Sequence, residues 1–172
     1  LLPGRSDLGN WGGSHNHELI RDGQRLFLIM VMRNASIAQI GSPRQLYDAP
    51  ANHFVADFIG EANLIPCEVI DVSNEMAKID VRGFVHKLPA NGRSAGPATL
   101  AVRPSRLDIK AKAGIKATVR KATYVGNRME YSLHIGGLDV FAVHDDVNNP
   151  LSIDEEIHLG LFETGPVLLP AL

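Results

Sequence analysis

An alternation of apolar and polar residues runs through the C-terminal part of this chain and limits the folds open to it. From Asn63 onward, apolar side chains recur at every second position in four short segments separated by Gly, Pro, Asn and Asp clusters. A period of two is typical of strands that bury one face. The pattern therefore predicts a small all-β barrel. Its apolar positions are Ala77, Ile79 and Val81; Ala117 and Val119; Tyr131, Leu133 and Ile135; and Ile157, Leu159 and Leu161.

A faint internal repeat lies within this region. The apolar pattern of residues 65–69 recurs at residues 115–119, 50 residues later. Each copy leads through a turn to a second strand and then to glycine, at Gly83 or at Gly136-Gly137. Either the barrel consists of two similar halves, or two unrelated strand meanders share a common apolar pattern.

A hairpin is predicted before residue 63. The continuous apolar run Leu26–Met32 favours a buried strand, and residues 37–41 favour its partner. The turn between them requires positive φ, which Asn34 tolerates. Ala35 stands where Gly is expected, at a cost of about 1 kcal/mol.

Two short helices are predicted after the hairpin. Ser42 can cap a first helix that has Pro43 at its first position and ends before Pro50. Asn52 can cap a second helix, which Gly60 terminates. The boundary between this part and the β region is therefore expected near residues 60–63.

The composition excludes several classes of protein. Of the 172 residues, 45% are apolar and 21% charged, which is typical of a soluble globular protein. The net charge of −2 argues against a nucleic-acid coat protein or a polybasic membrane protein. The single cysteine, Cys67, excludes internal disulfides. The longest apolar run has seven residues, whereas a membrane-spanning helix needs about 20.

Motifs for catalysis and metal binding are absent from the sequence. No Gly-Lys dipeptide occurs, which excludes a phosphate-binding loop, and a single cysteine excludes thiolate-rich zinc sites. Residues 15–18 could hold a metal or be a polar entry to the first ordered segment. Residues 144–146, together with 154–156, could bind a cation or be solvated turns. We expect no catalytic residue, no metal and no cofactor in this chain.

One stretch is strongly basic. Residues 110–128 contain six Lys or Arg and no acid, with Tyr124 among them. Such a strip on a barrel could follow single-stranded nucleic acid, or the acidic turn 145–156 or a partner subunit could neutralise it. We expect neutralisation. The six residues of this basic strip are Lys110, Lys112, Lys116, Arg120, Lys121 and Arg128.

Residues 37–66 resemble a specific family signature, the junction between the nucleotide-binding domain and the C-terminal β domain in ATP-binding subunits of ABC importers. The closest group serves polyamines, ferric iron, phosphonates, glycerol phosphate and sugars. Residues 100–107 resemble a second signature, that of the C-terminal TOBE domain. The resemblance covers residues 26–170. The matching motifs are Gln39–Pro43, Leu46-Tyr47, Pro50–Gly60, Asn63, Leu100–Leu107, Tyr124-Val125-Gly126 and the closing strand 156–161.

The resemblance implies a mainly β fold, an OB-like TOBE barrel preceded by a β-hairpin and two short helices. Residues 1–25 are expected to be a leader or a remnant of the nucleotide-binding domain. Residues 26–62 would be the terminal hairpin and helical linker of that domain, and residues 63–172 the TOBE domain.

The resemblance also suggests roles for three residues. His15 resembles the switch histidine that contacts the ATP γ-phosphate. Arg103 and Arg106 of the second signature are candidates for regulation or for a structural ion pair. Because the phosphate loop and signature loop are absent, this chain is not expected to hydrolyse ATP, and ATP and Mg²⁺ would bind only in a full-length parent.

The function implied is that of a regulatory and dimerisation domain of an importer ATPase, with polyamine as the favoured solute. Its partners would be a second copy of itself, through strands 26–41, and the membrane subunits of the transporter. The parent complex would hold it on the cytoplasmic face of the cell membrane. The alternative is a stand-alone OB-type module for single-stranded nucleic acid or a small anion. Nucleic acid is not an expected partner of the chain.

Overall fold

The computed structural model describes residues 12–21 and 24–172 of the chain. Two compact units are present, the first ending at Gly60 and the second beginning at Glu61. Within the described residues, no helix is long and apolar enough to cross a membrane.

The first unit is a three-stranded antiparallel sheet, in the order β1-β2-β3, followed by two short helices. The predicted hairpin is confirmed as β2 and β3. The sequence predicts no strand before residue 26, whereas β1 pairs with β2 along its whole length. Because β1 lacks apolar alternation, only its backbone pairing with β2 identifies it. The elements are β1 (Gly12–Arg21), β2 (Gln24–Arg33), β3 (Ser36–Gly41), α1 (Pro43–Asp48) and α2 (His53–Phe58).

Both helices begin at the predicted caps. The backbone N–H of Gln45 donates to Ser42 Oγ (3.2 Å), and the N–H of Ser42 donates to Gln45 Oε1 (2.9 Å). This reciprocal capping box satisfies two amides that the helix leaves unpaired. Asn52 Oδ1 accepts from the N–H of Val55 (3.0 Å). The helices bury Leu46 and Val55 against Val31 of β2, and these three residues form the small core of this unit.

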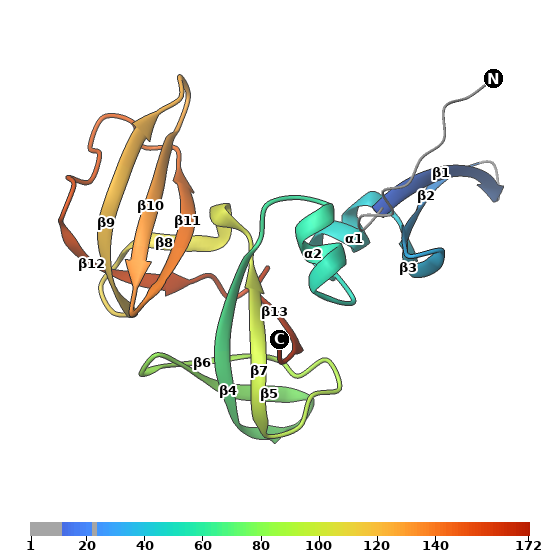
Figure 1. Ribbon diagram of the computed structural model, residues 1–172, viewed down its shortest axis with the longest axis horizontal. Coiled ribbons are helices and arrows are strands. Elements are labelled where there is room, and N and C mark those ends of the chain that lie inside the picture. Colours follow the sequence, from blue (N-terminus) through green and yellow to red (C-terminus); the bar gives the residue numbers. More distant parts are fainter. Residues whose placement is uncertain (1–11, 22–23) are drawn as a thin grey trace, which may run out of the picture. The chain divides into compact units, whose positions relative to one another are not determined.

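The second unit contains two five-stranded antiparallel sheets, in the orders β13-β7-β4-β5-β6 and β8-β12-β9-β10-β11 (Figure 1). The strands of the first sheet are β4 (Asn63–Ser73), β5 (Met76–Val81), β6 (Phe84–Pro89), β7 (Gly96–Val102) and β13 (Val167–Pro170). Those of the second are β8 (Leu107–Ala111), β9 (Ile115–Tyr124), β10 (Met129–Ile135), β11 (Leu138–His144) and β12 (Glu156–Leu161). A single 3₁₀ turn, η1 (Pro104–Arg106), precedes β8. The architecture agrees with the expected OB-like fold, as two open sheets rather than one closed barrel.

The two sheets repeat one arrangement, so the internal repeat seen in the sequence is structural. The meander β4-β5-β6 corresponds to β9-β10-β11, and β7 corresponds to β12. Ile65 lies opposite Leu100 in the first sheet, as Ile115 lies opposite Leu159 in the second. The fifth strands are exchanged, because β8 completes the second sheet and β13 completes the first. The first sheet therefore takes its fifth strand from the C-terminal end of the chain, after β12. The second sheet takes its fifth strand from the segment that follows β7.

The alternating residues form the core of this unit. All but two of the predicted apolar positions are buried, the exceptions being Ile157 and Leu161, which are half-buried. Buried residues from both sheets belong to one apolar cluster. Burial on alternate positions of β4, β5, β9 and β10 thus confirms the pattern from which the strands were predicted.

Two hairpin turns place a residue other than glycine in the left-handed backbone region, where a Cβ atom is unfavourable. Ala35 has φ of 60° in the β2–β3 turn, and Glu75 has φ of 60° in the β4–β5 turn. Glycine adopts this conformation without a Cβ penalty. We expect Glu75→Gly to raise the free energy of unfolding by about 1 kcal/mol, measured by urea denaturation. Ala113→Gly, at an exposed position outside the left-handed region, is the control, and an equal gain there would contradict the explanation.

Candidate functional site

The basic strip lies on β8, on β9 and in the turns beside them, and half of its members form ion pairs. Lys110 Nζ lies 2.5 Å from Asp146 Oδ2, and Arg120 Nη1 lies 3.5 Å from Asp154 Oδ1. Arg128 Nη2 lies 2.7 Å from Glu130 Oε1. The acidic turn 145–156 thus supplies two of the three partners, which favours neutralisation over a continuous nucleic-acid track.

Asp146 is tied to its surroundings by several hydrogen bonds. Besides Lys110, the side-chain amide of Asn149 donates to it (3.2 Å). These two side-chain hydrogen bonds hold the pKa of Asp146 well below its usual range. Among the residues described, no three His, Cys, Asp or Glu side chains come together in a way that could hold a metal ion.

The two arginines of the second signature have different surroundings. Arg103 is 4% exposed, and its Nη1 donates to the carbonyl of Glu61 (3.4 Å). Arg106, at the other end of η1, is exposed, and its aliphatic stem lies against Gly165. Burial of Arg103 favours the structural role over direct contact with a regulator, whereas Arg106 remains accessible.

Asn63 connects three strands of the second unit. Its Nδ2 donates to the carbonyls of Val102 (3.3 Å) and Phe141 (2.8 Å), and its Oδ1 accepts from the N–H of Phe141 (2.7 Å). These bonds join β4 to β7 in one sheet and to β11 in the other. The asparagine in the family-like signature therefore has a structural role that spacing along the sequence does not reveal.

His15 lies in β1, opposite Met30 of β2. Its side chain is outside the part of the chain that the structure describes. The switch-histidine assignment therefore stays a prediction.

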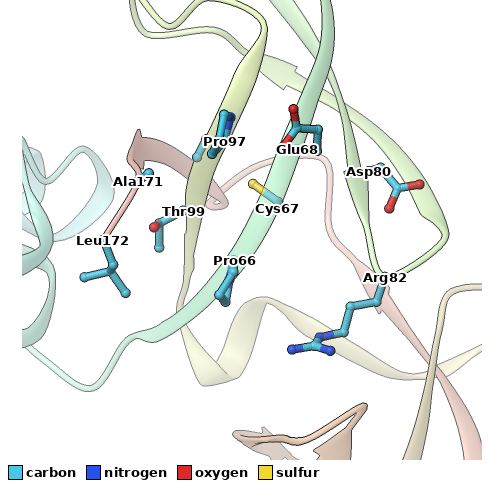
Figure 2. Close-up of a pocket in the computed structure, with 10 residues that line it drawn as sticks. Pro66, Cys67, Glu68, Asp80, Arg82, Pro97, Thr99, Ala171 and Leu172 are labelled. Carbon is cyan, nitrogen blue, oxygen red and sulfur yellow. The ribbon is translucent and has the colours of Figure 1, made fainter.

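Two surface clefts, one in each half of the second unit, were not apparent from the sequence. The first, of about 560 Å³, is lined by residues of β4, β5 and β7 and by Arg82, Ala171 and Leu172 (Figure 2). The second, of about 570 Å³, is lined by residues of β9, β10 and β12. No local motif marks either cleft, because its lining residues come from three separate strands.

Cys67 lines the first cleft but is a poor nucleophile. Burial, followed by the charge of Glu68, raises the pKa of its thiol to about 11, although a hydrogen bond with the backbone of Leu100 acts in the opposite direction. Only the thiolate is reactive. This low reactivity agrees with the prediction, from the alternation of apolar residues, that Cys67 is an inert core residue.

His86 on β6 gives the second unit a predicted sensitivity to acid. Its Nε2 is buried without a hydrogen-bond partner in the described part of the chain. Burial lowers the pKa of the imidazole, and the charge of Glu163 only partly opposes this.

As pH falls below about 6.5, the unfolded chain takes up a proton that the folded one resists, so stability should decrease. We expect His86→Gln to flatten the pH profile of the melting temperature between about pH 7 and pH 5. An equal flattening by His158→Gln, at an exposed position, would contradict this.

Comparisons with known proteins identify relatives of the chain. The family model for the TOBE domain matches residues 100–169. The Fe(3+) ions import ATP-binding protein FbpC of Brucella abortus (strain 2308) is 41% identical over 133 residues, which are 76% of this chain and 38% of that protein. FbpC of Rhizobium etli is 41% identical over 145 residues, 83% of this chain and 41% of the relative.

A relative that is named for a different solute also matches. The spermidine/putrescine import ATP-binding protein PotA of Ruegeria pomeroyi is 35% identical over 125 residues, 71% of this chain and 34% of that protein. The chain spans about two fifths of the length of the FbpC relatives. By these matches, the chain is a relative of ABC importer ATP-binding proteins that carries a TOBE domain over residues 100–169.

Proposed function

We propose that this chain serves as the C-terminal regulatory and dimerisation part of an ABC importer ATP-binding protein. The observation that carries the proposal is the TOBE match over residues 100–169, joined to 41% identity with FbpC over 76% of the chain. ATP and Mg²⁺ would bind to the nucleotide-binding domain of the parent protein, which would work with membrane subunits on the cytoplasmic face of the cell membrane.

The experiment that tests this is to sequence the genomic DNA upstream of the Leu1 codon and to translate the three forward frames. A phosphate loop and a signature loop in continuous frame are the expected result. The same motifs in a shifted frame, or in no frame at all, would refute the proposal and favour a remnant or a free-standing β module.

Ferric iron is the solute that we propose for the parent transporter, in place of the polyamine that the linker suggested. FbpC relatives are 41% identical to this chain, against 35% for PotA. Deletion of the gene should reduce uptake of radiolabelled ferric iron and leave putrescine uptake unchanged. The reverse result would restore the polyamine assignment.

Self-association is the further expectation for this chain in isolation. In the first unit, the side chains of Phe27, Ile37 and Ile40 are each at least half exposed on strands β2 and β3. Exposed apolar residues on neighbouring strands favour burial against another surface. We expect a dimer at micromolar concentration by light scattering, with Ile37→Lys shifting the chain toward monomer. If the unsubstituted chain is monomeric at that concentration, the proposal is contradicted.

A further inference from the structure

Three asparagines begin tight turns in the same backbone conformation. Asn34, Asn74 and Asn91 have φ of 51°, 50° and 49°, and all three are exposed. They differ in the residue that follows, which is alanine, glutamate and glycine respectively. Asn91 is the one asparagine in the sequence that glycine follows. The three turns therefore separate the effect of that glycine from the effects of exposure and backbone conformation.

Asn91 and Gly92 form the centre of the turn that follows β6. Both have positive φ, and the N–H of Arg93 donates to the carbonyl of Ala90 (2.9 Å), which closes the turn. Within the described part of the chain, no hydrogen bond engages the side-chain amide of Asn91 or the N–H of Gly92. Nothing lies within 4 Å of a Cβ added at Gly92. The side-chain amide of residue 91 and the backbone nitrogen of residue 92 are therefore neighbours that no other group shields.

An arginine contacts the peptide group that joins these two residues. Nε of Arg93 donates to the main-chain carbonyl oxygen of Asn91 (3.4 Å). This oxygen is conjugated with the backbone nitrogen of Gly92, so it shares the negative charge that forms when that nitrogen loses its proton. A guanidinium beside the oxygen stabilises the charge. Arg93 therefore favours the deprotonated, nucleophilic form of the Gly92 nitrogen.

From this geometry we infer that Asn91-Gly92 is a site of spontaneous covalent modification, at which Asn91 is converted to aspartate and isoaspartate. The deprotonated nitrogen of Gly92 forms a bond to Cγ of Asn91. The C–N bond of the side-chain amide breaks, and the amide nitrogen leaves as ammonia with the proton that Gly92 lost. A five-membered cyclic imide remains. Water opens this ring at either carbonyl carbon, which gives aspartate or isoaspartate, and water is the only co-reactant.

The turn at Asn91 presents less resistance to ring closure than the turn at Asn74. Closure requires the peptide plane after the asparagine to rotate away from its conformation in the turn. The left-handed conformation is itself unfavourable for a residue with a Cβ, so rotation relieves strain at both sites. Glycine at residue 92 has no side chain to obstruct the approach of its nitrogen to Cγ, whereas Glu75 has one. We therefore expect rapid conversion at Asn91 and slow conversion at Asn74.

The modification changes both the charge and the length of the connection between β6 and β7. Both products place a carboxylate at a cavity of about 480 Å³ that Glu75 and Arg93 also line. Isoaspartate also lengthens the main chain by one methylene group. The inference does not depend on the proposed transport function, because every reacting group belongs to this turn.

The test is peptide mapping by mass spectrometry after incubation of the 172-residue chain at neutral and at mildly alkaline pH. Trypsin cleaves after Lys87 and Arg93, so residues 88–93 form one peptide. We expect this peptide to gain the mass that replaces NH₂ with OH about tenfold faster than the peptides that contain Asn34 or Asn74. The rate should rise with pH, and a sample digested without incubation gives the background.

The products distinguish ring closure from direct hydrolysis of the side-chain amide. Opening of the imide gives two chromatographically separate peptides of equal mass, one with aspartate and one with isoaspartate. Direct hydrolysis gives aspartate alone, and that result would overturn the inference. Equal rates of conversion at Asn91 and Asn74 would also overturn it.

Two variants test the role of the glycine in opposite directions. Gly92→Ala should slow conversion of Asn91 about tenfold, because a Cβ obstructs ring closure. Glu75→Gly places glycine after Asn74 in a turn of the same φ and should accelerate conversion there about tenfold. Circular dichroism checks that each variant is folded. Unchanged rates in both variants would show that the residue after asparagine does not control the reaction, and would overturn the inference.

A third variant tests the contribution of Arg93. Arg93→Gln should slow conversion of Asn91 about threefold, because the charge that stabilises the deprotonated nitrogen is lost. The longer tryptic peptide of this variant reports the same change in mass. Lys78→Gln removes an exposed positive charge from β5 outside the cavity, so it is the matched control and should leave the rate unchanged. Equal slowing in the two variants would indicate a general effect of net charge and would overturn the role of Arg93.

Discussion

Replacing Asn63 with alanine is expected to lower the free energy of unfolding of the second unit by about 2 kcal/mol. The substitution leaves the N–H and carbonyl of Phe141 and the carbonyl of Val102 without the partners that Asn63 supplies. Each buried polar group that loses its partner costs about 1–3 kcal/mol, and partial exposure to water reduces the sum. Urea denaturation of the chain, followed by circular dichroism, measures the change.

A second readout separates loss of these bonds from general weakening. Amide exchange at Phe141 should accelerate more in Asn63→Ala than exchange at Leu133, in the middle of β10. Asn127→Ala, at an exposed position in the β9–β10 turn, is the control and should change stability little. Equal unfolding free energies for Asn63→Ala and Asn127→Ala would show that the connection between the sheets contributes nothing.

Local patterns predicted most of the elements in this chain. Alternation identified the buried faces of β5, β9 and β10, because a strand that buries one face must place apolar residues at every second position. The helix starts at Ser42 and Asn52 were predicted for a similar reason, since capping depends on side chains within one turn of the helix. Features governed by neighbours in the sequence were therefore visible without a structure.

Features that depend on distant parts of the chain were not predicted. The polar strand β1 is identified by its backbone pairing with β2. The exchange of β8 and β13 depends on pairing between residues far apart in the sequence. The second cleft likewise combines Lys116, His134 and His158 from three strands. The apolar pattern of the sequence revealed the repeat. The charged residues that line the two clefts can be compared only when the strands of the two halves are aligned in space.

Replacing Gly114 with alanine is expected to destabilise the second unit more, by about 3 kcal/mol, because no side chain fits at this position. An added Cβ would overlap the carbonyl oxygen of Leu159 and lie 2.6 Å from its carbonyl carbon. These are backbone atoms of β12, which pairs with both β9 and β8. A methyl group at residue 114 therefore forces β12 away from its neighbours. Urea denaturation measures the loss, and amide exchange should accelerate along β12.

Gly83→Ala distinguishes this steric effect from ordinary loss of backbone freedom. Gly83 has φ of +85°, yet nothing lies within 4 Å of an added Cβ. Its substitution should therefore cost only the left-handed backbone penalty, about 1 kcal/mol. Gly114 is not in the left-handed region, so backbone conformation alone predicts the opposite order, with Gly83→Ala the more damaging. If Gly114→Ala proves the milder change, close packing of residue 114 against β12 does not limit the fold.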